Sequence, residues 1–126
     1  MNDLIIKNTK NKGRGVFANR DFKIGETIEI CPVIVISSSG VDQLGKSILD
    51  EYFFLWESKE DAAIALGYGS LYNHSLNNNA IFEKDLINKT LIIKSINDIK
   101  KGDEIFINYF GDEKEKEDWL WFEDKK

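Results

Sequence analysis

The sequence predicts a mainly β domain that carries one short helical insert and ends in a helical or irregular tail. Short runs of β-branched and other apolar residues are separated by turns rich in Gly, Asn and Asp, which is typical of small antiparallel sheets. Apolar residues recur at helical spacing between residues 41 and 66, which predicts the insert. Residues 112–126 combine many charged side chains with aromatic ones, which sets the tail apart from the strands before it.

The composition is that of one ordinary globular domain. The 126 residues are enough to bury a real core, and 42% hydrophobic and 31% charged residues are usual proportions. The net charge of -5 disfavours direct binding to nucleic acid and suits a basic protein or peptide as partner. The N-terminus has no basic region followed by a long apolar stretch. We therefore expect no membrane association and an intracellular protein, in the cytoplasm or nucleus, or secreted into a host if the source is a pathogen.

The chain contains one cysteine, Cys31, and one histidine, His74. A single cysteine excludes an internal disulfide and a multi-cysteine zinc cluster built by this chain alone, and we expect no metal site. Cys31 lies in the apolar run 28–36, which predicts a buried and unreactive thiol.

The first part of the chain predicts strands joined by polar turns. Expected strands cover 4–7, 16–18 and 27–36, with turns or loops at 8–15, 21–26 and 37–40. Pro32 interrupts the third run, and proline cannot donate to a central ladder. The sequence therefore predicts a strand pair or an edge strand over 27–36.

The insert has apolar residues at helical spacing, namely Leu44, Ile48, Leu49, Tyr52, Phe53 and Trp56. Residues 62–66 fit either a short capped helix or a strand, and we favour the strand. A hairpin is expected from 80–86 and 90–96 around a turn at 87–89. After a turn at 97–103, the alternation in 104–110 predicts a strand buried on both faces.

Four features can carry chemistry, although each also has a purely structural interpretation. The glycine pair around Arg14, Gly13 and Gly15, permits close approach of a ligand or simply forms a turn. His74 can be a base, a metal ligand or a structural residue, and no further ligands stand at metal-site spacing. Tyr109, at a strand end, can face a cavity or belong to the core. The aromatic tail around Trp119 can dock on the core or cover a flat ligand.

In their order and spacing, three segments resemble the SET domain of protein-lysine methyltransferases. They are Lys12-Gly-Arg-Gly-Val-Phe-Ala18, Leu71-Tyr-Asn-His-Ser75 and Lys101-Gly-Asp-Glu-Ile-Phe-Ile-Asn-Tyr109. The resemblance makes 1–126 a single SET domain, with a core at about 4–111, the insert at about 41–66 and a C-terminal lid segment at 112–126. The chain looks most similar to the minimal stand-alone members of a large DNA virus and some bacteria.

The resemblance implies a β-clip fold of several small sheets around a knot-like crossing. It also implies S-adenosylmethionine as cofactor, with S-adenosylhomocysteine as product. The cofactor-binding residues that it implies are Gly13, Arg14, Gly15, Asn73, His74 and Trp119. The substrate lysine would enter a channel formed by Tyr52, Ile107 and Tyr109, with Tyr109 as the catalytic residue at the methyl-transfer point. Because many relatives carry Phe or Tyr at the position of Ile107, more than one methyl group is expected to fit.

The implied activity is methyl transfer to a lysine of a basic protein, which could be a histone or a histone-like or ribosomal protein. A homodimer is possible, since the viral relative is a dimer. One alternative is a catalytically inactive SET-fold protein-binding module. Another is a β-rich structural or small-molecule-binding domain that shares only the glycine-turn pattern. Retention of the glycine pair, Asn73, His74 and Tyr109 favours an active enzyme.

Overall fold

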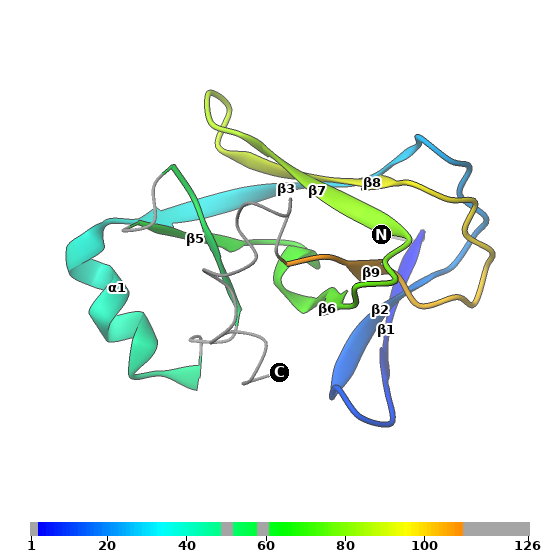
Figure 1. The fold of residues 1–126 in the computed structure, drawn as a ribbon, viewed down its shortest axis with the longest axis horizontal. Helices are drawn as coiled ribbons and strands as arrows, with labels where there is room; N and C mark the ends of the chain where they lie inside the picture. Colours follow the sequence, from blue (N-terminus) through cyan, green and yellow to red (C-terminus); the bar gives the residue numbers. More distant parts are fainter. Residues whose placement is uncertain (1–2, 49–51, 58–60, 110–126) are drawn as a thin grey trace.

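The computed structural model describes residues 3–48, 52–57 and 61–109, and within these ranges the chain is mainly β, as predicted. The elements in chain order are β1 (Leu4–Asn8), β2 (Arg14–Ala18), β3 (Thr27–Ile36), α1 (Ser38–Gly45), β4 (Phe53–Leu55), β5 (Ala62–Ala65), the 3₁₀ turn η2 (Gly69–Leu71), β6 (Asn73–His74), β7 (Ala80–Asp85), β8 (Thr90–Ser95) and β9 (Phe106–Ile107). They form a β1-β2 hairpin, a five-stranded sheet in the order β4-β5-β3-β8-β7, and a β6-β9 pair. The β6-β9 pair lies centrally, between the other two sheets (Figure 1). No helix in the described part of the chain is long and apolar enough to cross a membrane.

Strand β3 is one continuous central strand, so the prediction of a strand pair or an edge strand is wrong. It pairs with β8 up to Pro32 and with β5 from Val33 onward. The carbonyl of Pro32 accepts a hydrogen bond from the Leu66 N–H at 2.8 Å, just past the end of β5. The missing N–H of proline faces the same side, where the β5 ladder has ended. Proline is therefore tolerated at the point where β3 changes its partner.

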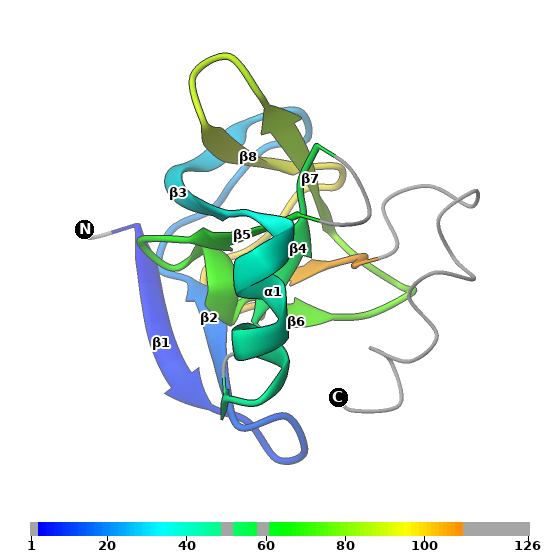
Figure 2. The same cartoon turned by 90° about the vertical axis from the view of Figure 1, so that its left-hand side faces the viewer.

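Helix α1 begins within the predicted loop 37–40, because the Ser37 carbonyl accepts bonds from the N–H groups of Gly40 and Val41 at 2.9 and 3.2 Å. The helix ends at Gly45 and does not continue through the apolar pattern of the insert. Phe53 and Phe54 instead belong to β4 and are both buried, since the two faces of this strand are covered by different apolar clusters. In Figure 2, α1 is seen in front of β4 and β5, and its Val41 packs against Phe53 of β4 and Ala62 of β5.

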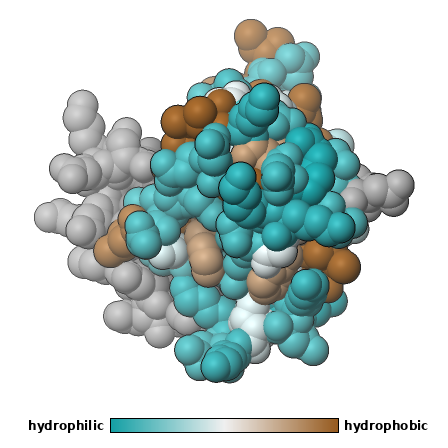
Figure 3. All heavy atoms as spheres, turned by 90° about the vertical axis from the view of Figure 1, so that its right-hand side faces the viewer, coloured by the Kyte–Doolittle hydropathy of each residue, from teal (hydrophilic) through white to brown (hydrophobic). Residues whose placement is uncertain are grey.

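The predicted strand at 62–66 and the predicted hairpin are confirmed as β5 and the β7-β8 pair. Lys89 takes a left-handed conformation (φ 54°) in the hairpin turn, and Ile87 at its tip is 92% exposed. The face in Figure 3 is mostly hydrophilic, and its apolar side chains form separate small groups rather than one continuous patch.

The predicted long strand at 104–110 is wrong in its extent and burial. Only Phe106 and Ile107 form β9. Ile105, Ile107 and Tyr109 are buried, whereas Phe106 is half-exposed, so one face of this segment enters the core and the other borders solvent. The segment is held by β2 on one side, where the Ile105 N–H bonds the Val16 carbonyl at 2.8 Å.

The main core joins all three sheets and includes the Cys31 side chain, which is fully buried as predicted. Burial raises the pKa of the Cys31 thiol, and the nearby Glu29 carboxylate raises it further. The thiolate form is therefore disfavoured, which makes Cys31 an unreactive core residue.

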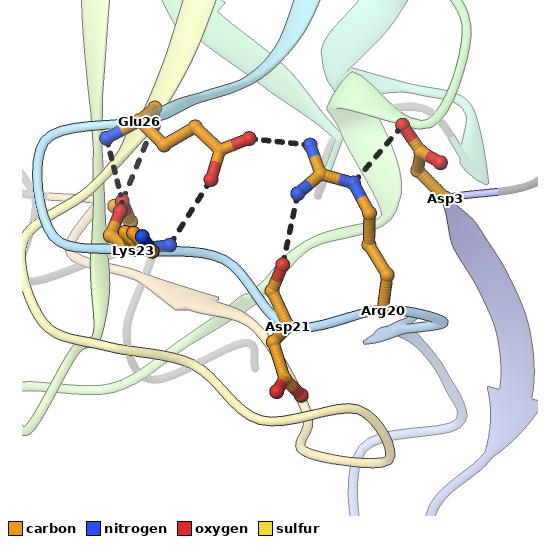
Figure 4. Close-up of polar contacts among 6 residues, drawn as sticks. Asp3, Arg20, Asp21, Lys23 and Glu26 are labelled. Atoms are coloured by element: carbon orange, nitrogen blue, oxygen red, sulfur yellow. Dashed lines mark hydrogen bonds and ion pairs between the residues drawn. The ribbon is translucent and has the colours of Figure 1, made fainter.

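Arg20 joins the N-terminal hairpin to the turn before β3 (Figure 4). Its guanidinium donates to the Glu26 carboxylate at 2.5 Å and lies 3.3 Å from that of Asp3. It also covers the Phe22 ring at 4.0 Å from the centroid. The bond to Glu26 raises the pKa of Arg20, and the bond from Arg20 lowers the pKa of Glu26.

Candidate functional site

The candidate site is built on the parallel pairing of β6 with β9, which brings two distant chain segments together. Asn73 lies opposite Phe106 and His74 opposite Ile107, and the Ser75 N–H donates to the Ile107 carbonyl at 3.0 Å. Because backbone groups alternate in direction along a strand, those of His74 point away from β9. On that side of β6, the His74 carbonyl accepts a hydrogen bond from the ammonium of Lys12.

The carboxamide of Asn73 ties this pair to the glycine segment. Its Nδ2 donates to the Arg14 carbonyl at 3.2 Å and to Glu104 Oε2 at 2.8 Å. A Cβ atom on Gly15 would overlap the Glu104 carboxylate and lie 2.8 Å from Asn73 Nδ2. A side chain at this position would have to displace the Glu104 carboxylate and the Asn73 amide, so packing inside the protein favours glycine, whatever else approaches it.

The turn before Gly15 is fixed by different contacts. Gly13 has φ +69°, and a Cβ built on it would meet no atom within 4 Å, so the space beside it is open. Thr9 closes the turn by donating from its N–H and its hydroxyl to the Gly13 carbonyl at 2.7 and 2.8 Å. The turn carries Lys12, whose ammonium donates to the His74 carbonyl and lies 5.8 Å from the centroid of the Phe106 ring. One cation therefore links the glycine turn to both strands of the central pair.

The His74 ring is buried and contacts Tyr109. Its Nδ1 accepts the Tyr109 N–H at 3.0 Å, so the proton of the neutral ring lies on Nε2. The rings of the two residues are 5.0 Å apart at a tilt of 33°. This arrangement gives the only histidine a structural task, which is to fix the backbone that presents Tyr109.

The Tyr109 phenol is also buried and is oriented by the backbone before β6. Its hydroxyl donates to the Tyr72 carbonyl at 2.5 Å, and its ring meets that of Phe54 edge-on at 6.3 Å. Since the phenol proton is committed to a carbonyl, the oxygen can act only as an acceptor toward any further group. An oriented acceptor of this kind suits an amine N–H or a polarised C–H.

Sequence reasoning missed two residues that hold the site together, Glu104 and Asn79. Asn79 Oδ1 accepts the Phe106 N–H at 2.8 Å, and its Nδ2 donates to the Glu104 carbonyl at 2.9 Å. Glu104 in turn holds Asn73. Glu104 lies within a segment that the motif analysis marked, and Asn79 lies just past another, but their side-chain partners are far away along the chain.

The remaining predicted site residues lie on β9, just before β4 and outside the described part of the chain. Ile107 is fully buried on β9 and two residues from Tyr109. Tyr52 is half-buried just before β4, the strand that supplies Phe54 to the Tyr109 ring. Trp119 and the predicted lid at 112–126 lie outside the described residues. Among the residues that are described, no group of three or more His, Cys, Asp or Glu side chains is placed to hold a metal ion.

The polar groups of the site match a ligand that carries both charges. The carboxylate of Glu104 and the carbonyls of Arg14 and Tyr72 are acceptors that favour a cation. The ammonium of Lys12 is a donor that favours an anionic group. The open space at Gly13 lies at the same hairpin as Lys12. The site therefore combines a carboxylate, from Glu104, with an ammonium, from Lys12.

Comparison with known proteins gives a consistent family. The model of the SET domain matches residues 13–110. The chain is 37% identical over 123 residues to a Schizosaccharomyces pombe protein named histone-lysine N-methyltransferase, H3 lysine-37 specific, covering 97% of this chain and 78% of the relative. This relative comes from a eukaryote, so the similarity of the chain to viral and bacterial members stays a prediction.

Solved structures share the fold. A Plasmodium falciparum protein described as a candidate histone methyltransferase superposes with a TM-score of 0.66 at 35% identity, over 86% of this chain and 94% of that chain. A mutant Chaetomium thermophilum Polycomb Repressive Complex 2 gives a TM-score of 0.68 at 23% identity, over 84% of this chain and 14% of that one, and supports the fold alone. The three ordered motifs, the small sheets and the central strand crossing therefore agree with one family.

Proposed function

The chain belongs to the SET domain family, and on that premise we propose that it is an S-adenosylmethionine-dependent protein-lysine methyltransferase. The observation that carries the proposal is the convergence at β6 and β9 of the glycine segment, Asn73-His74 and the oriented phenol of Tyr109. These groups come from three parts of the chain. A protein that had kept only the fold would not need a buried phenol oriented in this way.

The residues that would hold the cofactor are the backbone of Gly13, Arg14 and Gly15 together with Asn73 and His74. When bound, S-adenosylmethionine supplies an electrophilic methyl group on a sulfonium. The protein's part is mainly to hold two reactants in line, because positioning carries much of the rate of such a displacement. Glu104 adds a negative charge that complements a cationic ligand beside Asn73.

Tyr109 would act on the substrate amine. Lysine has an ordinary pKa of about 10.4, and an apolar channel beside a cation disfavours its charged form. The Tyr109 oxygen, oriented by its bond to the Tyr72 carbonyl, would accept an N–H of the neutral amine and aim its lone pair. Ile107 is smaller than Phe or Tyr, and we propose that products beyond monomethyl-lysine form, which mass spectrometry of the methylated peptide would test.

The proposed substrate is a histone or another basic protein. The yeast relative is named for lysine 37 of histone H3, and the net charge of -5 in this chain favours a basic partner. An intracellular location, in the cytoplasm or nucleus, is proposed because a histone substrate would be found there. A homodimer is proposed as one way to supply further parts of the substrate channel.

The test is calorimetric titration with S-adenosylmethionine and S-adenosylhomocysteine, followed by methyl transfer from labelled cofactor to histone and ribosomal proteins. We expect saturable binding of both compounds and transfer to lysine. Asn73→Ala should weaken binding of both, because it removes the contacts to Arg14 and Glu104. Asn88→Ala is the matched control, since Asn88 bonds only Asp85 among the contacts described for the hairpin turn.

Two results would count against this function. Binding of basic peptides without cofactor binding or methyl transfer would favour an inactive SET-fold protein-binding module. Equal cofactor affinity in Asn73→Ala and the control would show that the site lies elsewhere.

A further inference from the structure

Glu29 is a buried carboxylate that the proposed chemistry does not use. It lies on β3 opposite Ile93 and is 8% exposed, and among the residues the structure describes no other Asp or Glu is buried. A charge is costly to bury unless strong hydrogen bonds compensate it. Its partners therefore indicate what the protein gains from it.

Both carboxylate oxygens of Glu29 bind the loop that leads into β6. Oε1 accepts the Tyr72 hydroxyl at 2.7 Å, and Oε2 accepts the Tyr68 N–H at 3.0 Å. Tyr72 is fully buried, and burial followed by the Glu29 charge raises the pKa of its phenol, so it stays a donor. The carboxylate thus fixes one side chain and one backbone group four residues apart.

The loop is shaped to accept this carboxylate. Gly67 has φ +64°, and a Cβ atom on it would overlap Glu29 Oε2. Ser70 closes the other side of the loop by bonding both the N–H and the carbonyl of Ala65 at 3.1 and 2.9 Å. Gly67 leaves room for the Glu29 carboxylate, and the bonds of Ser70 to Ala65 fix the backbone of the loop. Together they hold Tyr72 in place.

The same tyrosine also accepts a hydrogen bond from Tyr109. The Tyr72 side chain reaches Glu29, while its backbone carbonyl accepts the Tyr109 hydroxyl at 2.5 Å. We propose that Glu29 is a positioning residue, which sets the orientation of the Tyr109 phenol by anchoring Tyr72. The catalytic consequence rests on the proposed function, whereas the positioning of Tyr109 does not.

The first measurement is NMR of protein labelled with ¹³Cζ-tyrosine. The chain has four tyrosines, so each signal can be assigned by one Tyr→Phe variant. Glu29→Gln, which keeps the shape and loses the charge, is expected to shift the Tyr109 signal. Tyr72→Phe removes the link from the other end and should shift the same signal. Glu83→Gln is the matched control, because that carboxylate is exposed on β7 and pairs with Lys94 at 3.0 Å.

The second measurement is methyl transfer in a double-mutant cycle. Glu29→Gln should lower kcat at least about tenfold while the KM for cofactor changes by less than about threefold. In a Tyr109→Phe background, where the phenol is already absent, Glu29→Gln should have much less effect on kcat. An effect through general loss of structure would appear equally in both backgrounds.

The outcomes separate the positioning role of Glu29 from the proposed methyltransferase function. An unchanged Tyr109 signal in folded Glu29→Gln overturns the positioning role, and if that variant does not fold, an unchanged signal in Tyr72→Phe does so. Equal effects of Glu29→Gln on kcat in both backgrounds overturn its action through Tyr109. If the wild-type protein transfers no methyl group, the proposed function fails, while the NMR result still decides whether Glu29 positions Tyr109.

Discussion

Replacing Tyr109 by Phe separates the chemical role of its hydroxyl from the structural role of its ring. Phenylalanine keeps the ring contacts with His74 at 5.0 Å and with Phe54 at 6.3 Å. It loses only the donor that binds the Tyr72 carbonyl at 2.5 Å. The protein should therefore still fold, with a free energy of unfolding lowered by the loss of this one hydrogen bond.

That loss can be sized from the structure. A buried carbonyl left without its donor costs about 1–3 kcal/mol, whereas truncation of the whole ring would cost about 3–5 kcal/mol. We expect Tyr109→Phe to lower the free energy of unfolding by about 1–3 kcal/mol, which corresponds to roughly 3–5 °C in Tm for each kcal/mol. Turnover should fall much further, by about 10²-fold or more, because the acceptor that orients the amine is gone.

The assay pairs urea unfolding with initial rates at saturating cofactor and peptide. Tyr68→Phe is the stability control, since the same atom is removed and the Tyr68 N–H that binds Glu29 remains. A Tyr109→Phe enzyme whose kcat stays within about a factor of two of the wild type would refute the role of the phenol. A stability loss near that of ring truncation would refute the structural part of the argument.

Three further predictions concern other parts of the fold. Gly15→Ala should destabilise the protein by about 1–3 kcal/mol in urea unfolding, because its Cβ would overlap the Glu104 carboxylate, and a neutral result would contradict this packing. The Glu26 pKa is lowered by Arg20, so the stability that this pair contributes is present above the ordinary carboxyl pKa and is lost as the pH falls through the lowered folded value. Arg20→Gln should therefore flatten the stability profile between about pH 5 and 3, measured by urea unfolding, and an unchanged profile would refute the linkage. Native Cys31 should resist thiol-specific reagents at pH 8 and react only on unfolding, since it is fully buried with a raised pKa, and rapid labelling of the folded protein would be the contrary result.

Much of the fold was predictable because it depends on neighbours in the sequence. The β7-β8 hairpin and its turn, the strands β1 and β2 and the strand β5 follow from apolar runs and turn residues that act over a few positions. The glycine, Asn-His and tyrosine motifs also marked the right segments. The predictions from local sequence were wrong at Pro32 and Phe53. At Pro32 the outcome depended on which strand pairs with β3, and at Phe53 it depended on both faces of β4 being covered.

The sequence by itself determined the family, the mainly β class and the segments that meet at the site. The tertiary structure alone decided that Glu104 holds Asn73, that Lys12 binds the His74 carbonyl and that Glu29 anchors Tyr72. These bonds join residues 31, 62 and 43 positions apart. No periodicity or turn preference extends over such distances, because a side-chain hydrogen bond depends on the position of two atoms in space and not on their separation along the chain.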